Sequence, residues 1–267
     1  MTKISILGCG WLGLPLAKAL LGKGFSVNGS TTSTEKLSIL EKAGITPFLI
    51  SLDSKSVSGA IESFLQESST LIIDIPPKLR GTNKENFVEK IKVLIPFIEK
   101  SSVENVLFVS STSVYGEGND IVTEESPLNP DTESGKQLVE AEQLLQSNTN
   151  FKTTVLRFGG LIGEDRHPVK FLAGRENLDN PDAPINLIHQ QDCIGIILKI
   201  IETNSWNETF NAVTPFHPSR SSYYTEKAMN LNLALPKFNP ENASIGKTIF
   251  SDKIETVLNY TFIKPNL

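Results

Sequence analysis

The sequence predicts an α/β protein built on a doubly wound parallel sheet, with a small lobe at its C-terminal end. Three observations lead to this fold class. A glycine-rich turn joins an apolar run to a helical pattern near the N-terminus, short apolar runs alternate with helical patterns as far as Phe158, and the pattern then breaks up. A chain of 267 residues can bury one sizeable core or two modest ones, which suits this organisation.

The first element pair carries the most specific signal in the chain. An apolar run at residues 3–7 ends in a turn with three spaced glycines, and a helical pattern follows to about residue 21. The turn consists of Gly8, Cys9, Gly10, Trp11, Leu12 and Gly13. In a Rossmann-type fold these glycines permit the tight turn, the approach of a pyrophosphate, and close packing of helix on strand. We therefore predict dinucleotide binding here, against the alternative of a tight turn in an unrelated α/β protein.

The elements that follow alternate in type as far as Phe158. The apolar, β-branched runs are typical of strands that are covered on both faces. We predict strands at residues 3–7, 25–29, 46–52, 70–75, 105–110 and 153–158, and helices at 83–100 and 134–147. Pro96 lies inside the first of these helical patterns and should kink it or end its regular part.

Beyond Phe158, glycines and prolines interrupt the chain, and the predicted elements are short. We expect a strand at 185–188, a helix at 191–203, a strand at 209–213 and a helix at 219–230. We divide the chain into a dinucleotide-binding Rossmann domain at 1–158 and a small substrate lobe at 159–267, with 185–213 contributing back to the Rossmann core. Ligands of open α/β sheets bind at the carboxyl ends of the strands, where this lobe should lie.

Composition narrows the possible partners and the compartment. The net charge of −5 gives no basic footprint for nucleic acid or an anionic membrane. Three histidines and two cysteines offer no metal-ligand spacing, and two cysteines give no disulfide framework. No basic leader precedes the first strand, and no apolar run reaches the roughly 18 residues of a membrane span. We expect a cytoplasmic protein without a metal site.

A second polar motif follows the strand at 105–110. The hydroxyl row Ser110, Ser111, Thr112 and Ser113 runs into Tyr115-Gly116, at the carboxyl end of that strand. With the glycine turn, Leu156-Arg157…Gly163 and His189…Asp192, this row makes the chain resemble the extended short-chain dehydrogenase/reductases, the NAD(P)-dependent epimerase/dehydratase family. The resemblance implies an NAD(P)-binding protein like the nucleotide-sugar epimerases, dehydratases and reductases. It also implies a possible homodimer through the helices near 84–100 and 134–147.

The chain departs from this family at the catalytic pair. The family carries Tyr-x-x-x-Lys where Ser134 and Leu138 stand here, so the usual general acid/base and its lysine are replaced. Ser111 matches the catalytic Ser/Thr of the family, and Tyr115 is our first candidate for the proton donor. The alternative is a non-catalytic NAD(P)-binding regulatory or redox-sensing protein.

The end of the second strand bears on the choice of cofactor. NAD binders usually place a carboxylate there, whereas this chain has Ser30, Thr31 and Thr32 and no carboxylate before Glu35. Hydroxyls with Lys36 nearby would tolerate a 2′-phosphate, so we predict NADP, with NAD as second choice; an ordinary helix-capping loop is the alternative. The predicted cofactor site is completed by Ile75, Pro76, Pro77 and Ser110. Arg80 either reaches a phosphate or is a solvated surface residue.

Several cationic side chains in the lobe suggest the charge of the substrate. The predicted substrate-binding residues are Arg166, His167, Arg175, His189 and Arg220. In a chain with a net negative charge, such side chains facing the cleft would suit a phosphate or carboxylate. The alternative is a solvated surface with alternating charges. We expect an anionic small-molecule substrate.

Overall fold

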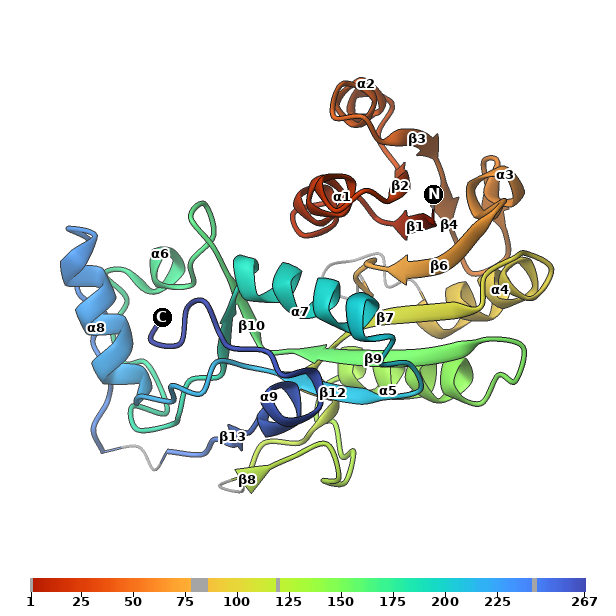
Figure 1. Cartoon of the computed structure of the whole chain (residues 1–267). Coiled ribbons are helices and arrows are strands. Elements are labelled where there is room, and N and C mark those ends of the chain that lie inside the picture. The colour runs from red at the N-terminus through yellow and green to blue at the C-terminus, as the bar shows by residue number, and fades with distance from the viewer. Residues whose placement is uncertain (1, 78–85, 119–120, 242–243) are drawn as a thin grey trace.

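The computed structural model describes residues 2–77, 86–118, 121–241 and 244–267 and has a central parallel sheet flanked by helices (Figure 1). Seven strands lie in the order β12-β9-β7-β6-β1-β2-β3, and all neighbouring pairs are parallel. In chain order they are β1 (Lys3–Leu7), β2 (Ser26–Thr31), β3 (Thr46–Leu49), β6 (Ser68–Ile73), β7 (Asn105–Ser111), β9 (Lys152–Phe158) and β12 (Thr209–Ala212). The predicted Rossmann-type fold class is confirmed.

Helices cover both faces of this sheet. They are α1 (Gly13–Gly22), α2 (Thr34–Lys42), α3 (Ile61–Leu65), α4 (Phe87–Glu99), α5 (Glu133–Gln146), α7 (Gln190–Thr203) and α9 (Asp252–Leu258). Two more helices, α6 (Val169–Leu172) and α8 (Arg220–Asn230), lie away from the sheet in a separate buried cluster. One buried cluster joins the sheet to α3, α4 and α5, and another joins it to α1, α7 and α9. The apolar strand residues supply both clusters, because successive side chains of a strand point to opposite faces.

Two local expectations need adjustment. The strand expected at 46–52 ends at Leu49, because β4 (Ser51–Leu52) turns away to pair antiparallel with β5 (Val57–Ser58). Pro96 does not end α4, which continues to Glu99. The other elements of the first 158 residues lie close to their predicted positions.

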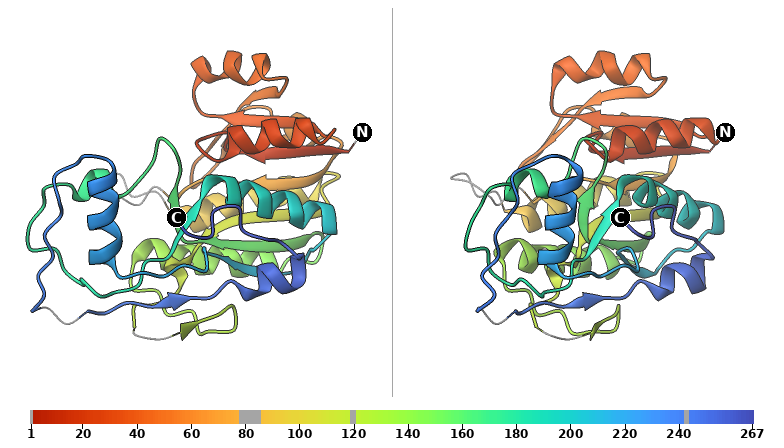
Figure 2. Two further views of the ribbon diagram at one scale, coloured as in Figure 1. Left: turned by 60° about the vertical axis from the view of Figure 1, so that its left-hand side comes forward. Right: turned by 90° about the vertical axis from the view of Figure 1, so that its left-hand side faces the viewer.

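The chain after Phe158 contributes both to the main sheet and to a small lobe. β12 joins the main sheet beside β9, and α7 packs on that sheet near α1. Helix α9 packs against α7 and β12. A small lobe is formed by α6, α8 and the parallel pair β10 (Gly160–Ile162) and β11 (Leu187–His189). A further parallel pair is formed by β8 (Ile121–Val122) and β13 (Thr248–Ile249). Two turned views show the lobe beside the carboxyl ends of the main strands (Figure 2).

Two classes of feature are missing from the described part of the chain. No described helix combines the length and the apolar character needed to cross a membrane. Among the same residues, no group of three or more His, Cys, Asp or Glu side chains could hold a metal ion.

Candidate functional site

The glycine turn after β1 is shaped by two positions that accept no side chain. Gly8 has a φ of +111°, and a Cβ atom on it would lie 2.2 Å from the carbonyl oxygen of Asp74. A Cβ atom on Gly13 would lie 2.2 Å from the carbonyl oxygen of Gly8. By contrast, no neighbouring atom lies within 4 Å of a Cβ atom placed on Gly10. The turn is therefore tight on its inner side and open at Gly10.

The open side of this turn carries unused hydrogen-bond donors. The backbone N–H groups of Trp11 and Leu12 immediately precede α1 and make no hydrogen bond within the described residues. The dipole of a ten-residue helix adds positive potential at the same end. Free N–H groups, a helix N-terminus and space at Gly10 fit the pyrophosphate of a dinucleotide.

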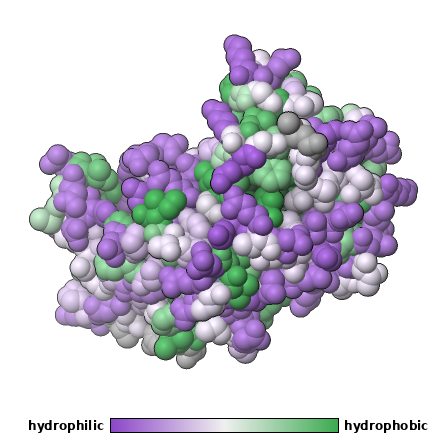
Figure 3. Space-filling model, viewed as in Figure 1, coloured by the Kyte–Doolittle hydropathy of each residue, from purple (hydrophilic) through white to green (hydrophobic). Residues whose placement is uncertain are grey.

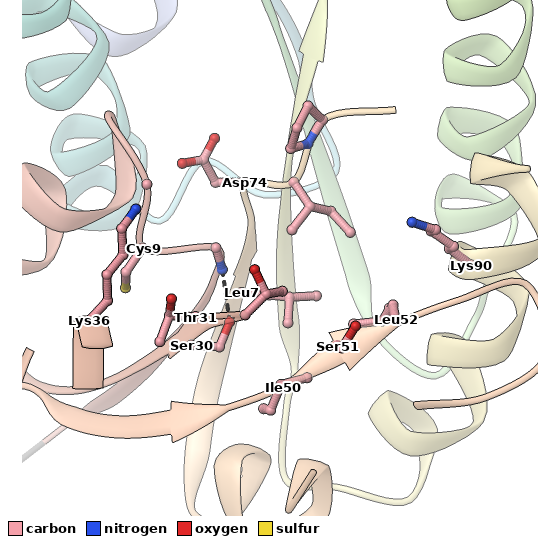
Figure 4. A pocket seen from close by; sticks show the side chains of 15 residues that line it. Leu7, Cys9, Ser30, Thr31, Lys36, Ile50, Ser51, Leu52, Asp74 and Lys90 are labelled. Atoms are coloured by element: carbon pink, nitrogen blue, oxygen red, sulfur yellow. Dashed lines mark hydrogen bonds between the residues drawn. The ribbon is translucent and has the colours of Figure 1, made fainter. Parts of the chain in front are cut away.

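A cavity of about 210 Å³, the glycine-turn cavity, lies beside this turn (Figure 4). Nine predicted cofactor residues line it: Gly8, Cys9, Gly10, Ser30, Thr31, Thr32, Lys36, Ile75 and Pro76. The others do not: Trp11, Leu12, Gly13, Pro77 and Ser110. Arg80 lies outside the described residues. In the space-filling view the surface is indented between the part carrying α1 and α2 and the lobe carrying α8 (Figure 3).

Ser30 connects the end of β2 to the glycine turn. Its hydroxyl accepts a hydrogen bond from the Gly8 N–H at 2.9 Å, and its carbonyl accepts one from the Cys9 N–H at 2.8 Å. Ser30 is buried, whereas Thr32 is exposed at the edge of the same cavity. Ser30 thus fixes the turn, whereas Thr32, like Ser51, is a hydroxyl residue of this cavity that solvent reaches.

Asp74 and Lys90 line the glycine-turn cavity and were not predicted as site residues. Burial raises the pKa of the Asp74 carboxyl to about 7, and a hydrogen bond from the Gly13 N–H partly offsets that rise. The pKa of the Cys9 thiol is raised to about 12, mainly by burial and also by the nearby Asp74. Lys36 and Lys90 lie on opposite sides of the cavity (Figure 4). Asp74 directly follows the apolar strand β6, a sequence signal that could have identified it.

Trp11 joins the glycine turn to the loop after β10. Its indole N–H donates to Asp165 Oδ1 at 2.9 Å, and the Arg166 guanidinium lies 4.9 Å from the ring centroid. On the other side, Gln190 Nε2 donates to the Trp11 carbonyl at 2.7 Å. Arg166, predicted as a substrate residue, therefore lies against the glycine turn.

A larger cavity of about 870 Å³, the lobe cavity, lies between the carboxyl ends of the strands and the lobe. Its polar lining includes Ser111, Ser113, Glu117, Arg220 and Lys247. Ser111 and Arg220 are the predicted catalytic and substrate residues that line it. The Nε atom of Arg220 is buried and has no hydrogen-bond partner among the described residues. The cavity thus offers hydroxyls and cations to a ligand.

The other predicted substrate residues do not gather in the lobe cavity. His167 and His189 line a separate pocket of about 360 Å³, and Arg175 is exposed. His167 contacts the Tyr223 hydroxyl at 3.0 Å, and burial together with Lys227 and Lys170 lowers its pKa to about 4. His189 caps α7 by accepting from the Gln191 N–H, and its pKa is lowered mainly by burial.

Tyr115 and Ser110 belong to a buried polar network. The Tyr115 hydroxyl donates to Asn211 Oδ1 at 2.8 Å and accepts from Arg157 Nη1 at 2.7 Å. Arg157 also pairs with Glu142 at 2.7 Å, and the Ser110 hydroxyl donates to the same carboxylate at 2.5 Å. Tyr115 is buried, does not line the lobe cavity, and has a pKa raised by burial. The network links β7, α5, β9 and β12.

Helix α5 carries the two residues at the family's catalytic positions. Ser134 is partly exposed in its first turn, and Leu138 is buried in the core cluster on that face of the sheet. A Cβ atom on Gly135 would lie 2.3 Å from the carbonyl oxygen of Ser113, so this helix starts directly against the hydroxyl row. The start of α5 is thus close to the lobe cavity but carries neither tyrosine nor lysine at these positions.

A family model places this architecture in a known class. The model of the NAD dependent epimerase/dehydratase family matches residues 4–175. Protein YeeZ of Escherichia coli (strain K12) is 32% identical over 268 residues, which cover 100% of this chain and 97% of that protein. The chain belongs to the NAD dependent epimerase/dehydratase family, as its motifs predicted.

Solved structures show the same fold over nearly the whole chain. A functionally unknown conserved protein from Silicibacter pomeroyi DSS superposes with a TM-score of 0.82 at 21% identity, covering 100% of this chain and 95% of that one. UDP-glucuronic acid 4-epimerase from Bacillus cereus, solved in complex with NAD, gives a TM-score of 0.79 at 18% identity, covering 98% and 91%. At these identities the likeness establishes the fold.

Proposed function

We propose that this protein binds NAD(P) in the glycine-turn cavity and acts on an anionic small molecule, of the nucleotide-sugar type, in the lobe cavity. The observation that carries the proposal is the open position at Gly10 beside the unused N–H groups of Trp11 and Leu12. Such an arrangement suits a pyrophosphate, because the two N–H groups make no hydrogen bond within the described residues and are available to an anion. When bound, the nicotinamide cofactor would supply the redox chemistry.

The charges of the lobe cavity support an anionic substrate. Among the described residues that line it, Arg220 and Lys247 are cationic and Glu117 is the carboxylate. Arginine binds phosphate and carboxylate groups in a bidentate manner, and the buried Nε of Arg220 lacks a partner among those residues. The Bacillus cereus relative is named for a UDP-linked uronic acid, a substrate of the same charge.

We propose NADP as the preferred cofactor, with NAD as second choice. No carboxylate lines the glycine-turn cavity at the end of β2, where the ribose of NAD is usually held. The exposed Thr32 and the Lys36 ammonium would instead accommodate a 2′-phosphate.

Calorimetric titration with NADPH and NADH tests the cofactor site. Gly10→Val should abolish binding because its side chain fills the open space that the pyrophosphate needs, while the fold is retained. Gly22→Val is the matched control, since Gly22 is also free of neighbours within 4 Å but lies at the far end of α1. If the wild type binds neither nucleotide, or Gly10→Val binds like the wild type, the proposed cofactor site is wrong.

For catalysis we propose that Ser111 orients the substrate oxygen and that turnover is slow. Ser134 and Leu138 supply neither the acid/base nor its cation, and losing a positioned acid/base typically costs about 10²–10⁴ in rate. The same two residues favour the second candidate, a non-catalytic NAD(P)-binding regulatory or redox-sensing protein. Turnover of keto-sugar substrates that falls in Ser111→Ala would support the enzyme. Cofactor binding without turnover would support the sensor.

We also propose a homodimer through α4 and α5. These helices pack side by side on one face of the sheet (Figure 1). Light scattering after size-exclusion chromatography should give twice the mass of the chain. A monomer at all concentrations would contradict this proposal.

A further inference from the structure

We propose that an anionic group of the substrate binds Lys247 in place of the Glu117 carboxylate, which pairs with Lys247 when the cavity is empty. In this view Lys247 is a substrate-binding residue, and Glu117 is an internal competitor that leaves when the substrate binds. The inference rests on the proposed function, because it concerns the ligand of the lobe cavity.

Lys247 is held firmly at the wall of this cavity. It is 5% exposed, and its ammonium donates to the Tyr115 carbonyl at 2.8 Å and to Glu117 Oε1 at 2.9 Å. Its backbone is fixed by Asn186, whose side chain donates to the Lys247 carbonyl at 2.7 Å and accepts from the Ile249 N–H at 2.9 Å. The cation therefore stays where it is, whichever anion it meets.

Glu117 differs from its partner in exposure. In this ion pair the Glu117 side chain is 60% exposed, and the Lys247 side chain is 6% exposed. A carboxylate that is largely in water can leave the pair at little cost, whereas a buried ammonium without an anion is strongly unfavourable. Exchange of Glu117 for another anion preserves the charge pairing of Lys247.

The position of Lys247 indicates which part of a ligand it meets. Tyr115, whose carbonyl it contacts, directly follows the short 3-10 turn Thr112–Val114, which carries the hydroxyl row. Arg220 is anchored to the same stretch of wall, because its N–H donates to the Ala183 carbonyl at 3.0 Å and Gly246 packs against Ala183. With Glu117 displaced, two cations line the cavity among the described residues, so the ligand should carry two negative sites.

A purely structural ion pair makes a different prediction from a competitor. If the pair only stabilises the cavity wall, removal of either partner should weaken ligand binding or leave it unchanged. If Glu117 competes with the ligand, its removal should strengthen binding, and removal of Lys247 should weaken it. The two substitutions then have opposite signs.

The experiment is calorimetric titration of UDP-glucose and UDP-glucuronic acid into the wild type, Glu117→Gln and Lys247→Met. We expect Glu117→Gln to bind about five- to tenfold more tightly, and Lys247→Met about tenfold or more weakly. A loss for both probes in Lys247→Met would assign the pyrophosphate to Lys247, and a loss for UDP-glucuronic acid alone would assign the sugar carboxylate. Glu125→Gln, an exposed carboxylate away from the cavity, is the control.

The proposal is overturned if Glu117→Gln binds both probes no more tightly than the wild type, or binds neither. It is also overturned if a folded Lys247→Met keeps wild-type affinity. Should Lys247→Met fail to fold, the exposed Glu117→Gln variant still decides. Titration of NADPH into the same samples should be unaffected by either substitution, so a failure of the cofactor site is seen separately.

Discussion

The glycine-turn cavity and the lobe cavity are built in different ways. The first is lined by the glycine turn and by segments at or near the ends of neighbouring strands, at 30–32, 50–52 and 74–76, together with Lys36 and Lys90. Two glycines that accept no Cβ atom, Gly8 and Gly13, shape its turn. The second is lined by residues from segments that are far apart in the sequence, at 111–113, 117, 159–160, 168–172, 180–187, 220–224 and 245–249. A glycine turn can be recognised from a local sequence motif. A cavity lined by residues that are distant in sequence depends instead on how the loops are placed.

Loss of the buried network around Arg157, whose residues line neither cavity and link β7, α5, β9 and β12, should have the largest effect. Arg157→Leu leaves the buried Glu142 carboxylate unpaired, which should cost about 3–5 kcal/mol of unfolding free energy. Urea unfolding monitored by circular dichroism measures the change. Lys237→Leu, which breaks an exposed ion pair with Glu176, should give no resolvable change. Equal stability of the two variants would show that the buried network contributes no more to the unfolding free energy than an exposed ion pair does.

Alanine substitutions at Gly13 and Gly10 should differ in their effect on stability. Gly13→Ala should destabilise the protein by about 3 kcal/mol, because its Cβ atom would overlap the Gly8 carbonyl. Gly10→Ala, the matched control, should stay within about 1 kcal/mol of the wild type, since its Cβ atom meets no neighbour within 4 Å. If both variants lose a similar amount of unfolding free energy, the inner and open sides of the turn do not differ in the way described.

The buried Asp74, which lines the glycine-turn cavity, should make the stability of the protein depend on pH. Its pKa is raised from 3.8 to about 7, so between these values the folded chain holds a proton that the unfolded chain has lost. The stability that this group contributes is therefore full below pH 3.8 and is lost as pH rises through 7, by at most about 1.4 kcal/mol per pH unit.

The measurement is urea unfolding between pH 4.5 and 8 for the wild type and Asp74→Asn, whose amide does not titrate. The difference between the two should shift in favour of Asp74→Asn as the pH rises. Parallel pH profiles would mean that Asp74 is ionised throughout.

The smallest expected effect concerns the preference between NADPH and NADH. Thr32→Asp places a carboxylate at the exposed edge of the glycine-turn cavity, where it should repel a 2′-phosphate and accept from ribose hydroxyls. We expect the ratio of NADPH to NADH affinity to fall about fivefold, or about 1 kcal/mol. Ser30→Asp is a poorer test, because it removes the bond from the Gly8 N–H. An unchanged ratio would remove Thr32 from the ribose site.

The same contrast explains how much the sequence could predict. The fold class and the family followed from apolar runs and ordered motifs, and most residues of the glycine turn and β2 end line the expected cavity. In the lobe, Arg220 lines the lobe cavity but Arg166 lies over the ring of Trp11, because loop conformation and not periodicity decides where a long side chain lies. Lys247 had no motif around it, since its partners Tyr115 and Glu117 are distant in sequence.

The position of β12 at the edge of the main sheet also affects how the chain folds during synthesis and where it can be truncated. β9 pairs with β7 on one side and with the late strand β12 on the other. During synthesis, β9 must wait with an open edge until residues 209–212 have left the ribosome. A fragment ending at Phe158 would keep that edge permanently, and unpaired edges of apolar strands promote aggregation. Any shortened form intended for expression should therefore retain the strand that closes this sheet.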